Sequence, residues 1–168
     1  NTAQHLLFPG TDAAILTLGD GSQVVLDSAG HGAISRQGLA EIINRKGALS
    51  YNAAEDGGNE RVAFNTVTTP RGGQYRVTLA DGTNVWLNAM ASIRFPTVFT
   101  GSERIVEVTG EAYFEVAKDK TRPFHARVNG MDVQALGTQF NINAYPDEPS
   151  VNITLLEGSV RVEKGDRR

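Results

Sequence analysis

The sequence predicts an all-β protein, a twisted, β-solenoid-like stack of short strands and hairpins. Glycine is abundant, with 18 residues in 168, whereas cysteine is absent and aromatic residues make up only 7% of the chain. Apolar and polar residues alternate in many short segments, and Asp-Gly pairs lie between such segments, as they do in hairpins. Similar segments also recur along the chain, which favours stacked turns over a closed sandwich.

The clearest recurrence is a hairpin unit. The segment Thr17–Asp27, TLGDGSQVVLD, returns at Thr78–Asn88 as TLADGTNVWLN. Each copy carries an Asp-Gly pair, beginning at Asp20 or Asp81, between alternating apolar residues. A type I′ turn requires positive φ at both central positions, and this dipeptide tolerates it. We therefore expect a type I′ hairpin in each copy.

Alternation fixes the faces of the strands around the second hairpin. Tyr75, Val77 and Leu79 follow the two-residue period of a half-buried strand and are expected to point to one side. The sole tryptophan, Trp86, is expected on the face opposite to that of Val85. Packing is the preferred interpretation of Trp86, although an exposed tryptophan would be a strong interface anchor.

A weaker repeat covers the second half of the chain. Apolar residues occupy alternate positions around Gly110, Gly137 and Gly158. Short strands at this spacing are typical of a repetitive β architecture.

One segment is a helix candidate. Gly38–Lys46 has Leu39, Ile42 and Ile43 at helical spacing and basic residues in its last turn. A short apolar run of this kind is equally compatible with a strand. We therefore expect at most one short helix, near residues 38–46.

Two polar segments divide the chain. The stretch Tyr51–Asn59 is polar and glycine-rich and is predicted to be a loop. In Thr68–Gly73, Pro70 blocks ladder pairing, so the main internal boundary is placed there. The predicted organisation is an N-terminal hairpin-containing segment, 1–68, and a β domain, 69–164, with 165–168 as the start of a linker.

Composition excludes several classes of protein. The net charge is -3 and the basic residues are scattered, so nucleic acid is not expected as a partner. Without cysteine there is no disulfide framework and no thiolate metal site. No apolar run approaches the roughly 20 residues of a membrane helix, and no signal peptide is visible. Because the chain opens at Asn1, we expect a fragment or a processed product.

Motifs for catalysis and cofactor binding are not found in the sequence. The three histidines, His5, His31 and His125, show no metal-ligand spacing, so a surface or structural role is expected for each. Gly19-Asp-Gly21 lacks the lysine of a phosphate-binding loop. The serines considered as nucleophiles, none of which lies in a Gly-x-Ser-x-Gly elbow, are Ser22, Ser28, Ser50 and Ser92. We expect no enzyme and no cofactor.

A pair of carboxylates supports a second hypothesis. Glu111 and Glu115 alternate with apolar residues, so both lie on one strand face at about the separation of a glycosidase acid pair. A solvated outer face is the preferred interpretation, because a catalytic pair needs a cleft. The alternative function is an extracellular carbohydrate-binding β-module or a β-helix glycosidase. The aromatic residues that would favour it if exposed are Tyr51, Tyr75, Trp86, Tyr113 and Tyr145. Asn152-Ile-Thr154 also matches a glycosylation sequon.

From Thr69 to Val162 the sequence resembles the FecR family of sigma regulators, of the Bacteroidetes type. The blocks that carry the resemblance, in the family's order, are Thr69–Tyr75 (TPRGGQY), Leu79–Ala89 (LADGTNVWLNA), Val108–Asp119 (VTGEAYFEVAKD), Arg122–Phe124 (RPF), Leu136–Tyr145 (LGTQFNINAY) and Leu156–Val162 (LEGSVRV). The preceding stretch, Ala13–Phe64, is similar to the segment before the FecR domain in these proteins.

The resemblance implies a function and a location. FecR-like anti-sigma factors are single-pass inner-membrane proteins, in which a cytoplasmic segment holds an extracytoplasmic-function sigma factor. Their periplasmic part receives a signal from an outer-membrane TonB-dependent transporter, so this chain would be periplasmic and anchored by an upstream helix.

The resemblance also implies which contacts to expect. A C-terminal α/β domain, absent from this chain, would be the main docking platform, and no small-molecule substrate is implied. Which residues of 1–168 bind a partner is left open. The last strand, Val160–Val162, is suited to edge pairing with a following domain or a partner.

Overall fold

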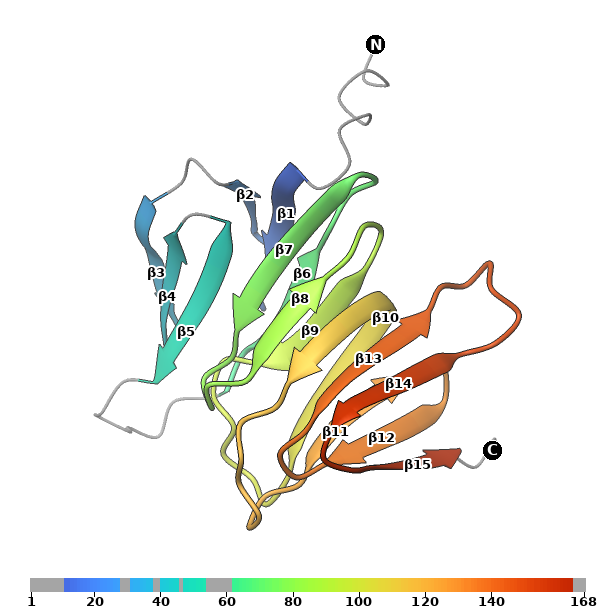
Figure 1. The fold of residues 1–168 in the computed structure, drawn as a ribbon. Helices are drawn as coiled ribbons and strands as arrows, with labels where there is room; N and C mark the ends of the chain where they lie inside the picture. The colour runs from blue at the N-terminus through green and yellow to red at the C-terminus, as the bar shows by residue number, and fades with distance from the viewer. Residues whose placement is uncertain (1–10, 28–30, 38–39, 46, 54–61, 165–168) are drawn as a thin grey trace.

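A computed structural model describes residues 11–27, 31–37, 40–45, 47–53 and 62–164, and every regular element among them is a β-strand (Figure 1). The strands are β1 (Thr11–Thr17), β2 (Gln23–Asp27), β3 (His31–Gln37), β4 (Ala40–Arg45), β5 (Ala48–Ala53), β6 (Phe64–Thr68), β7 (Gly73–Thr78), β8 (Asn84–Leu87), β9 (Ser92–Pro96), β10 (Arg104–Glu115), β11 (Phe124–Val128), β12 (Met131–Ala135), β13 (Gln139–Ala144), β14 (Asn152–Glu157) and β15 (Val160–Lys164). The predicted all-β class is confirmed.

The strands form two facing layers that run the length of the molecule (Figure 1). The first layer has the order β2-β1-β6-β9-β10-β11-β12-β15. The second has the order β3-β4-β5-β7-β8-β10-β13-β14. Most neighbours are antiparallel, whereas β1–β7, β5–β7 and β10–β11 are parallel. The stack is therefore built from hairpins that advance from one end to the other.

Strand β10 belongs to both layers. Its first half pairs with β9 and β11 in the first layer, and its second half pairs with β8 and β13 in the second. The transfer occurs at Gly110, whose φ is 79°. A Cβ at this position would lie 2.8 Å from the Ala91 Cα and 2.8 Å from the Met90 carbonyl oxygen. Glycine is required here both for the backbone angle and for the close approach of the neighbouring chain.

Both hairpins of the repeat form, but their turns differ from the prediction. In each turn the glycine amide donates to the carbonyl three residues earlier, from Gly21 to Leu18 and from Gly82 to Leu79. Only the glycines have positive φ, 90° and 89°, while the preceding aspartates do not. This is a type I turn followed by a glycine bulge. The predicted type I′ turn is therefore wrong, because each aspartate caps the turn with its side chain and keeps negative φ.

The helix candidate is also wrong. Ala40–Arg45 forms β4, which pairs with β3 and β5, while residues 38, 39 and 46 lie outside the described part of the chain. The alternative of a strand, left open by the sequence, holds because Ile42 and Asn44 face the core at a two-residue period. Pairing on both sides outweighs the weak helical spacing of a short run.

The core lies between the two layers, and aromatic rings from both meet there. Tyr51 of β5 contacts Phe95 of β9 edge to face, with ring centroids 4.9 Å apart. Phe114 contacts Phe124 of the first layer at 6.0 Å and stacks on Phe140 at 5.0 Å. Tyr51 was predicted to begin a loop, yet it lies in β5 with 2% of its surface exposed. Residues 54–59 of that predicted loop lie outside the described residues.

The predicted internal boundary coincides with the turn between β6 and β7, where Gly73 donates to the Pro70 carbonyl. The layers continue across it, since β1 pairs with both β6 and β7. The division into 1–68 and 69–164 stays a prediction. Within the described ranges the chain contains no helix long and apolar enough to span a membrane.

The two glycine positions Gly110 and Gly21 allow a matched test of the layer crossing. Gly110→Ala introduces both an unfavourable φ and a backbone clash, so we expect a loss of about 2–4 kcal/mol in the free energy of unfolding. Gly21→Ala, with nothing within 4 Å of the added Cβ, carries only the φ penalty, about 1 kcal/mol. Urea denaturation measures the free energy of unfolding of both variants. Equal losses would contradict the conclusion that β10 needs glycine at position 110 for the close approach of the neighbouring chain.

Candidate functional site

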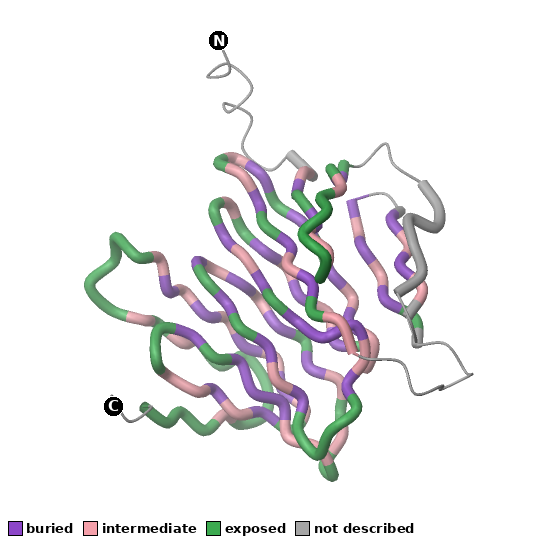
Figure 2. The backbone as a smooth tube through the Cα atoms, turned by 180° about the vertical axis from the view of Figure 1, so that it is seen from behind, coloured by how far each residue is buried: buried purple, intermediate pink, exposed green. Residues whose placement is uncertain are grey.

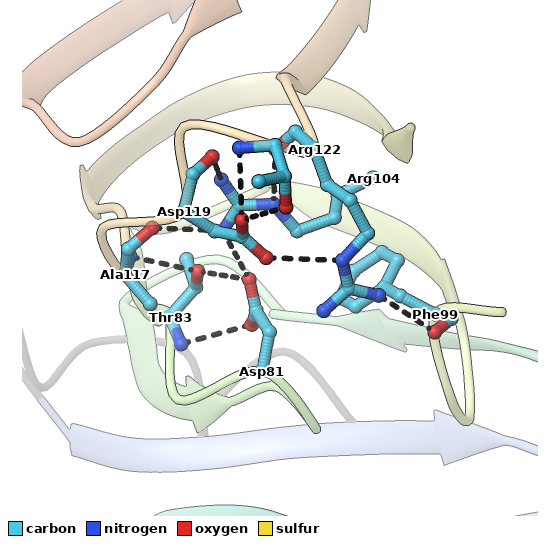
Figure 3. Close-up of polar contacts among 8 residues, drawn as sticks. Asp81, Thr83, Phe99, Arg104, Ala117, Asp119 and Arg122 are labelled. Carbon is cyan, nitrogen blue, oxygen red and sulfur yellow. Dashed lines mark hydrogen bonds and ion pairs between the residues drawn. The ribbon is translucent and has the colours of Figure 1, made fainter. Parts of the chain in front are cut away.

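The most buried charge in the described residues is Arg104, the first residue of β10, whose side chain is 0% exposed. Its Nη1 donates to Asp81 Oδ2 and to the Ala117 carbonyl, both at 2.8 Å, and its Nε donates to the Arg122 carbonyl at 2.9 Å (Figure 3). The guanidinium carbon also lies 5.5 Å from the centroid of the Phe124 ring. A buried charge is tolerated only when it is paired and hydrogen-bonded, and Arg104 meets both conditions.

Asp81 reaches Arg104 from the turn of the second hairpin. Its Oδ1 accepts the Thr83 amide at 2.9 Å, and its Oδ2 accepts the Thr83 hydroxyl at 2.7 Å. The Thr83 hydroxyl oxygen in turn accepts the Ala117 amide at 3.1 Å. The bulged turn therefore orients the Asp81 carboxylate through hydrogen bonds that do not involve Arg104.

A second ion pair borders the first. Arg122 Nε donates to Asp119 Oδ2 at 3.0 Å, and its Nη1 donates to the Phe99 carbonyl at 3.0 Å (Figure 3). Hydrogen bonds from Thr121, above all from its hydroxyl, together with the Arg122 guanidinium lower the pKa of Asp119 to about 2. We call Arg104, Asp81, Thr83, Asp119 and Arg122 the Arg104 centre. Its hydrogen bonds link the β7–β8 turn to the connection after β10, and Arg122 links that connection to the one before β10.

The first hairpin has a simpler anchor. Asp20 is exposed and accepts only from the amide and hydroxyl of Ser22, at 2.9 and 2.6 Å. The buried Asn65 accepts the Gly19 amide at 3.1 Å and donates to the Tyr51 hydroxyl at 2.6 Å. The same turn is thus fixed by a neutral amide in one copy and by a charged pair in the other. The Arg104 centre is a structural device, since its polar atoms are used by one another.

Of the three histidines, only His125 has side-chain contacts that the structure describes. His125 Nδ1 lies 2.9 Å from both carboxylate oxygens of Asp132, and its Nε2 lies 3.5 Å from Glu103. His31 is described only as the first residue of β3, and His5 lies outside the described residues. In the described ranges no group of three or more His, Asp or Glu is arranged to hold a metal ion.

The carboxylates Glu111 and Glu115 share a strand face, but their surroundings differ. Glu111 is half-buried and accepts from the amide of Asn88 at 2.6 Å, whereas Glu115 is exposed. Glu111 lines a shallow pocket of about 210 Å³, and Glu115 is not among the residues that line it. A glycosidase acid pair faces one cleft, whereas this pocket contains only one of the two carboxylates.

The aromatic residues divide between core and surface. Tyr51 and Tyr75 are buried at 2% exposure, so they present no ring to solvent. Trp86 lies on the outer face, opposite Val85 as predicted, and contacts Tyr113 with centroids 5.4 Å apart. The Tyr145 hydroxyl donates to the Ala89 carbonyl at 2.6 Å. Asn152, of the sequon, is exposed in β14.

The strongest candidate for a protein contact is the end of the stack formed by β14 and β15. The register pairs Leu155 with Phe140 and Val162 with Val133, so both side chains face the gap between the layers. Their partners are fully buried, yet Leu155 is 44% exposed and Val162 is 47% exposed. Figure 2 shows the last strand, next to the C-terminus, coloured mostly as exposed. We call the inward-facing Ile153, Leu155, Val160 and Val162 the open end.

The two edge strands of the open end are protected differently. Strand β15 carries Arg161 and Glu163, which pair at 3.0 Å on its surface. Charges of this kind discourage pairing with a foreign strand. Strand β14 has no charged residue from Asn152 to Leu156. Its free edge is therefore the better template for an added strand.

Sequence reasoning identified the edge at Val160–Val162 but missed the Arg104 centre and the exposure of Leu155. The signal for the edge was local, an alternating last strand. Nothing local distinguishes Arg104 from the exposed arginines, because its partners come from Asp81 and Ala117, 23 and 13 residues away. A basic residue at an inward position of an alternating strand is the one pattern that would have revealed it.

Comparisons with known proteins give a consistent result. The sequence profile of the family described as FecR protein matches residues 65–161, more than half of the chain. Two crystal structures of a candidate anti-sigma factor from Parabacteroides distasonis are similar, each at 32% identity. One has a TM-score of 0.50 and covers 61% of each chain; the other has a TM-score of 0.49 and covers 60% of each. The chain thus spans about three fifths of those proteins. No curated protein matches it.

The pair of Arg104 and Asp81 can be tested by removing one charge. Arg104→Met leaves the Asp81 carboxylate without its cation in a buried site, and we expect a loss of about 3–5 kcal/mol in the free energy of unfolding. The control is Arg94→Met, since Arg94 lies 3.9 Å from Glu107 at the surface and should cost about 1 kcal/mol or less. Comparable losses in urea denaturation would show that the buried pair does not stabilise the fold.

Asp119 makes stability depend on pH. Its pKa is about 2 in the folded protein and about 4 in an unfolded chain, so the folded state binds fewer protons in that window. Its contribution is present above pH 4 and is lost as the pH falls toward 2. The stability difference between wild type and Asp119→Asn should therefore shrink over this range in thermal unfolding. Glu115→Gln, at an exposed position, is the control, and a constant Asp119→Asn difference would refute the assignment.

Proposed function

Because the chain belongs to the FecR protein family, we propose that it is the body of an anti-sigma factor that relays a signal through protein contacts. The proposed input is an outer-membrane TonB-dependent transporter, and the proposed output is an extracytoplasmic-function sigma factor held by another part of the same protein. The outcome is regulated transcription of uptake genes. The proposed location is the periplasm, with an inner-membrane anchor upstream.

The observation that carries the proposal is the open end. A folded domain normally covers the inner faces of its strands, yet Leu155 and Val162 continue the core and are nearly half exposed. An apolar surface next to a strand edge without charge from Asn152 to Leu156 fits a partner that adds a strand and covers the core. The occupant proposed for it is a following domain or the periplasmic signalling domain of the transporter.

The rest of the fold supports transmission of such a contact. The two layers share β10, and the Arg104 centre fixes the connections on both sides of that strand. A stack held in this way moves as one unit, so a contact at one end can change the position of the other. No step of this role requires a reaction, and the FecR family is regulatory.

Charge placed at the open end should interrupt the relay. In full-length protein in its native host, we expect Leu155→Glu with Val162→Glu to reduce transporter-dependent expression of a sigma-controlled reporter by about tenfold, equivalent to about 1.4 kcal/mol of coupling. Both positions are exposed, so the fold should persist, which circular dichroism checks.

Val25→Glu provides the control. Val25 is 77% exposed on β2, at the opposite end of the first layer, and its substitution should leave the response unchanged. A normal response from the double variant would reject the open end as the contact surface. Failure of the full-length protein to bind any extracytoplasmic-function sigma factor in a two-hybrid assay would reject the anti-sigma function itself.

A further inference from the structure

The outer face of the second layer carries an unusual set of side chains. Cross-strand register places Arg76, Trp86, Tyr113, Asn141 and Thr154 in one row across β7, β8, β10, β13 and β14. The adjacent row includes Asn88, Glu111 and Asn143. Two adjoining shallow pockets of about 300 and 210 Å³ lie on this face and share Gln74, Trp86 and Leu87 as lining residues.

Glu111 organises the polar part of the smaller pocket. Its carboxylate accepts amide N–H groups from Asn88 at 2.6 Å, from Asn141 at 3.1 Å and from Asn143 at 3.3 Å. The Oδ1 of Asn143, which borders Glu111, is buried without a hydrogen-bond partner among the described residues. Asn141 lines the pocket with an amide that offers both an acceptor and a donor, so a ligand with hydroxyl groups can bond to it.

The aromatic side of the pocket is equally fixed. The Trp86 and Tyr113 rings meet at an interplanar angle of 52°, and the Arg76 guanidinium carbon lies 5.8 Å from the centroid of the indole. The Tyr113 hydroxyl donates to Gln139 Oε1 at 3.0 Å, which holds the ring in place. Half-buried rings held in this way offer apolar contact at little loss of conformational entropy.

The chemistry of the pocket selects among ligands. A single carboxylate whose oxygens already accept three amide hydrogens is a poor metal site, because hard cations need several free oxygen ligands. The Glu111 charge disfavours anions such as phosphate or uronic acids in the smaller pocket, while Arg76 lines the larger one. Hydroxyl groups both donate and accept, and adjacent hydroxyls match the paired oxygen and nitrogen of an asparagine amide. The C–H face of a sugar ring can lie against the electron-rich face of the indole.

We propose that these two pockets form a binding site for neutral saccharides, with Trp86 as the ring platform and Glu111 and Asn141 as the hydroxyl-binding group. The shared wall lets consecutive rings of an oligosaccharide occupy adjoining pockets. The site is independent of the relay function, since it lies on the outer face of the second layer and uses none of the residues of the open end.

The test is a titration of the ¹⁵N-labelled protein with oligosaccharides, in which binding is monitored by two-dimensional ¹H–¹⁵N NMR. The probes are cellohexaose, maltohexaose, xylohexaose and mannohexaose, each up to about 10 mM, a range that detects millimolar binding. We expect at least one probe to give saturable shifts of the Trp86 indole N–H and the asparagine side-chain amides. Trp86→Ala and Glu111→Gln should each weaken that binding at least tenfold, or about 1.4 kcal/mol.

Asn84→Ala is the matched control. Asn84 lies on the same face in β8 but lines neither pocket, so its substitution should leave the affinity unchanged within about twofold. Glu111→Gln is nearly isosteric, which separates lost recognition from lost folding if Trp86→Ala unfolds. Absence of saturable shifts with all four probes, or unchanged binding by both pocket variants, would overturn the proposal without affecting the relay function.

Discussion

The ion pair between Arg104 and Asp81 is the interaction on which the rest of the structure depends. A guanidinium with 0% exposure must find acceptors in every direction, and those acceptors come from a hairpin turn and from the connection after β10. The pair forms only when these segments are correctly placed, so it selects one arrangement among many compact ones.

The same repeat therefore serves two different purposes. In the first hairpin, Asp20 only caps its own turn, and a buried amide from Asn65 secures the loop. In the second, Asp81 keeps this capping role and adds a long-range charge pair. The two copies thus share one turn, but only in the second does the carboxylate pair with a residue of another strand.

Much of the architecture follows from local patterns. The alternation at Tyr75, Val77 and Leu79 identified the buried face, and the Asp-Gly pairs located both hairpins, because strands and turns obey short-range rules. The turn type, the β4 strand and the place of Tyr51 in the core were missed. The turn type follows from the aspartate side chain that caps each turn, β4 is fixed by pairing with strands on both sides, and Tyr51 packs against the Phe95 ring, a partner distant in sequence.

The candidate sites show the same division. The edge strand at Val160–Val162 could be predicted from the sequence because its signal, the alternation of apolar and polar residues, lies within that one strand. The surroundings of Glu111 were not, because its asparagine partners lie 23 to 32 residues away. The sequence suggested a pair of glutamates, whereas the structure separates them into one held in an amide cluster and one left in solvent.

Strand β10 has a mechanical consequence for the whole molecule. Every route through backbone hydrogen bonds from one end of a layer to the other passes through this strand, because it occupies an interior position in both. The edges can fray independently, but opening β10 would sever both layers at once. Tension applied at either end would therefore be borne in series by a single segment, and the molecule would resist pulling until that segment gave way.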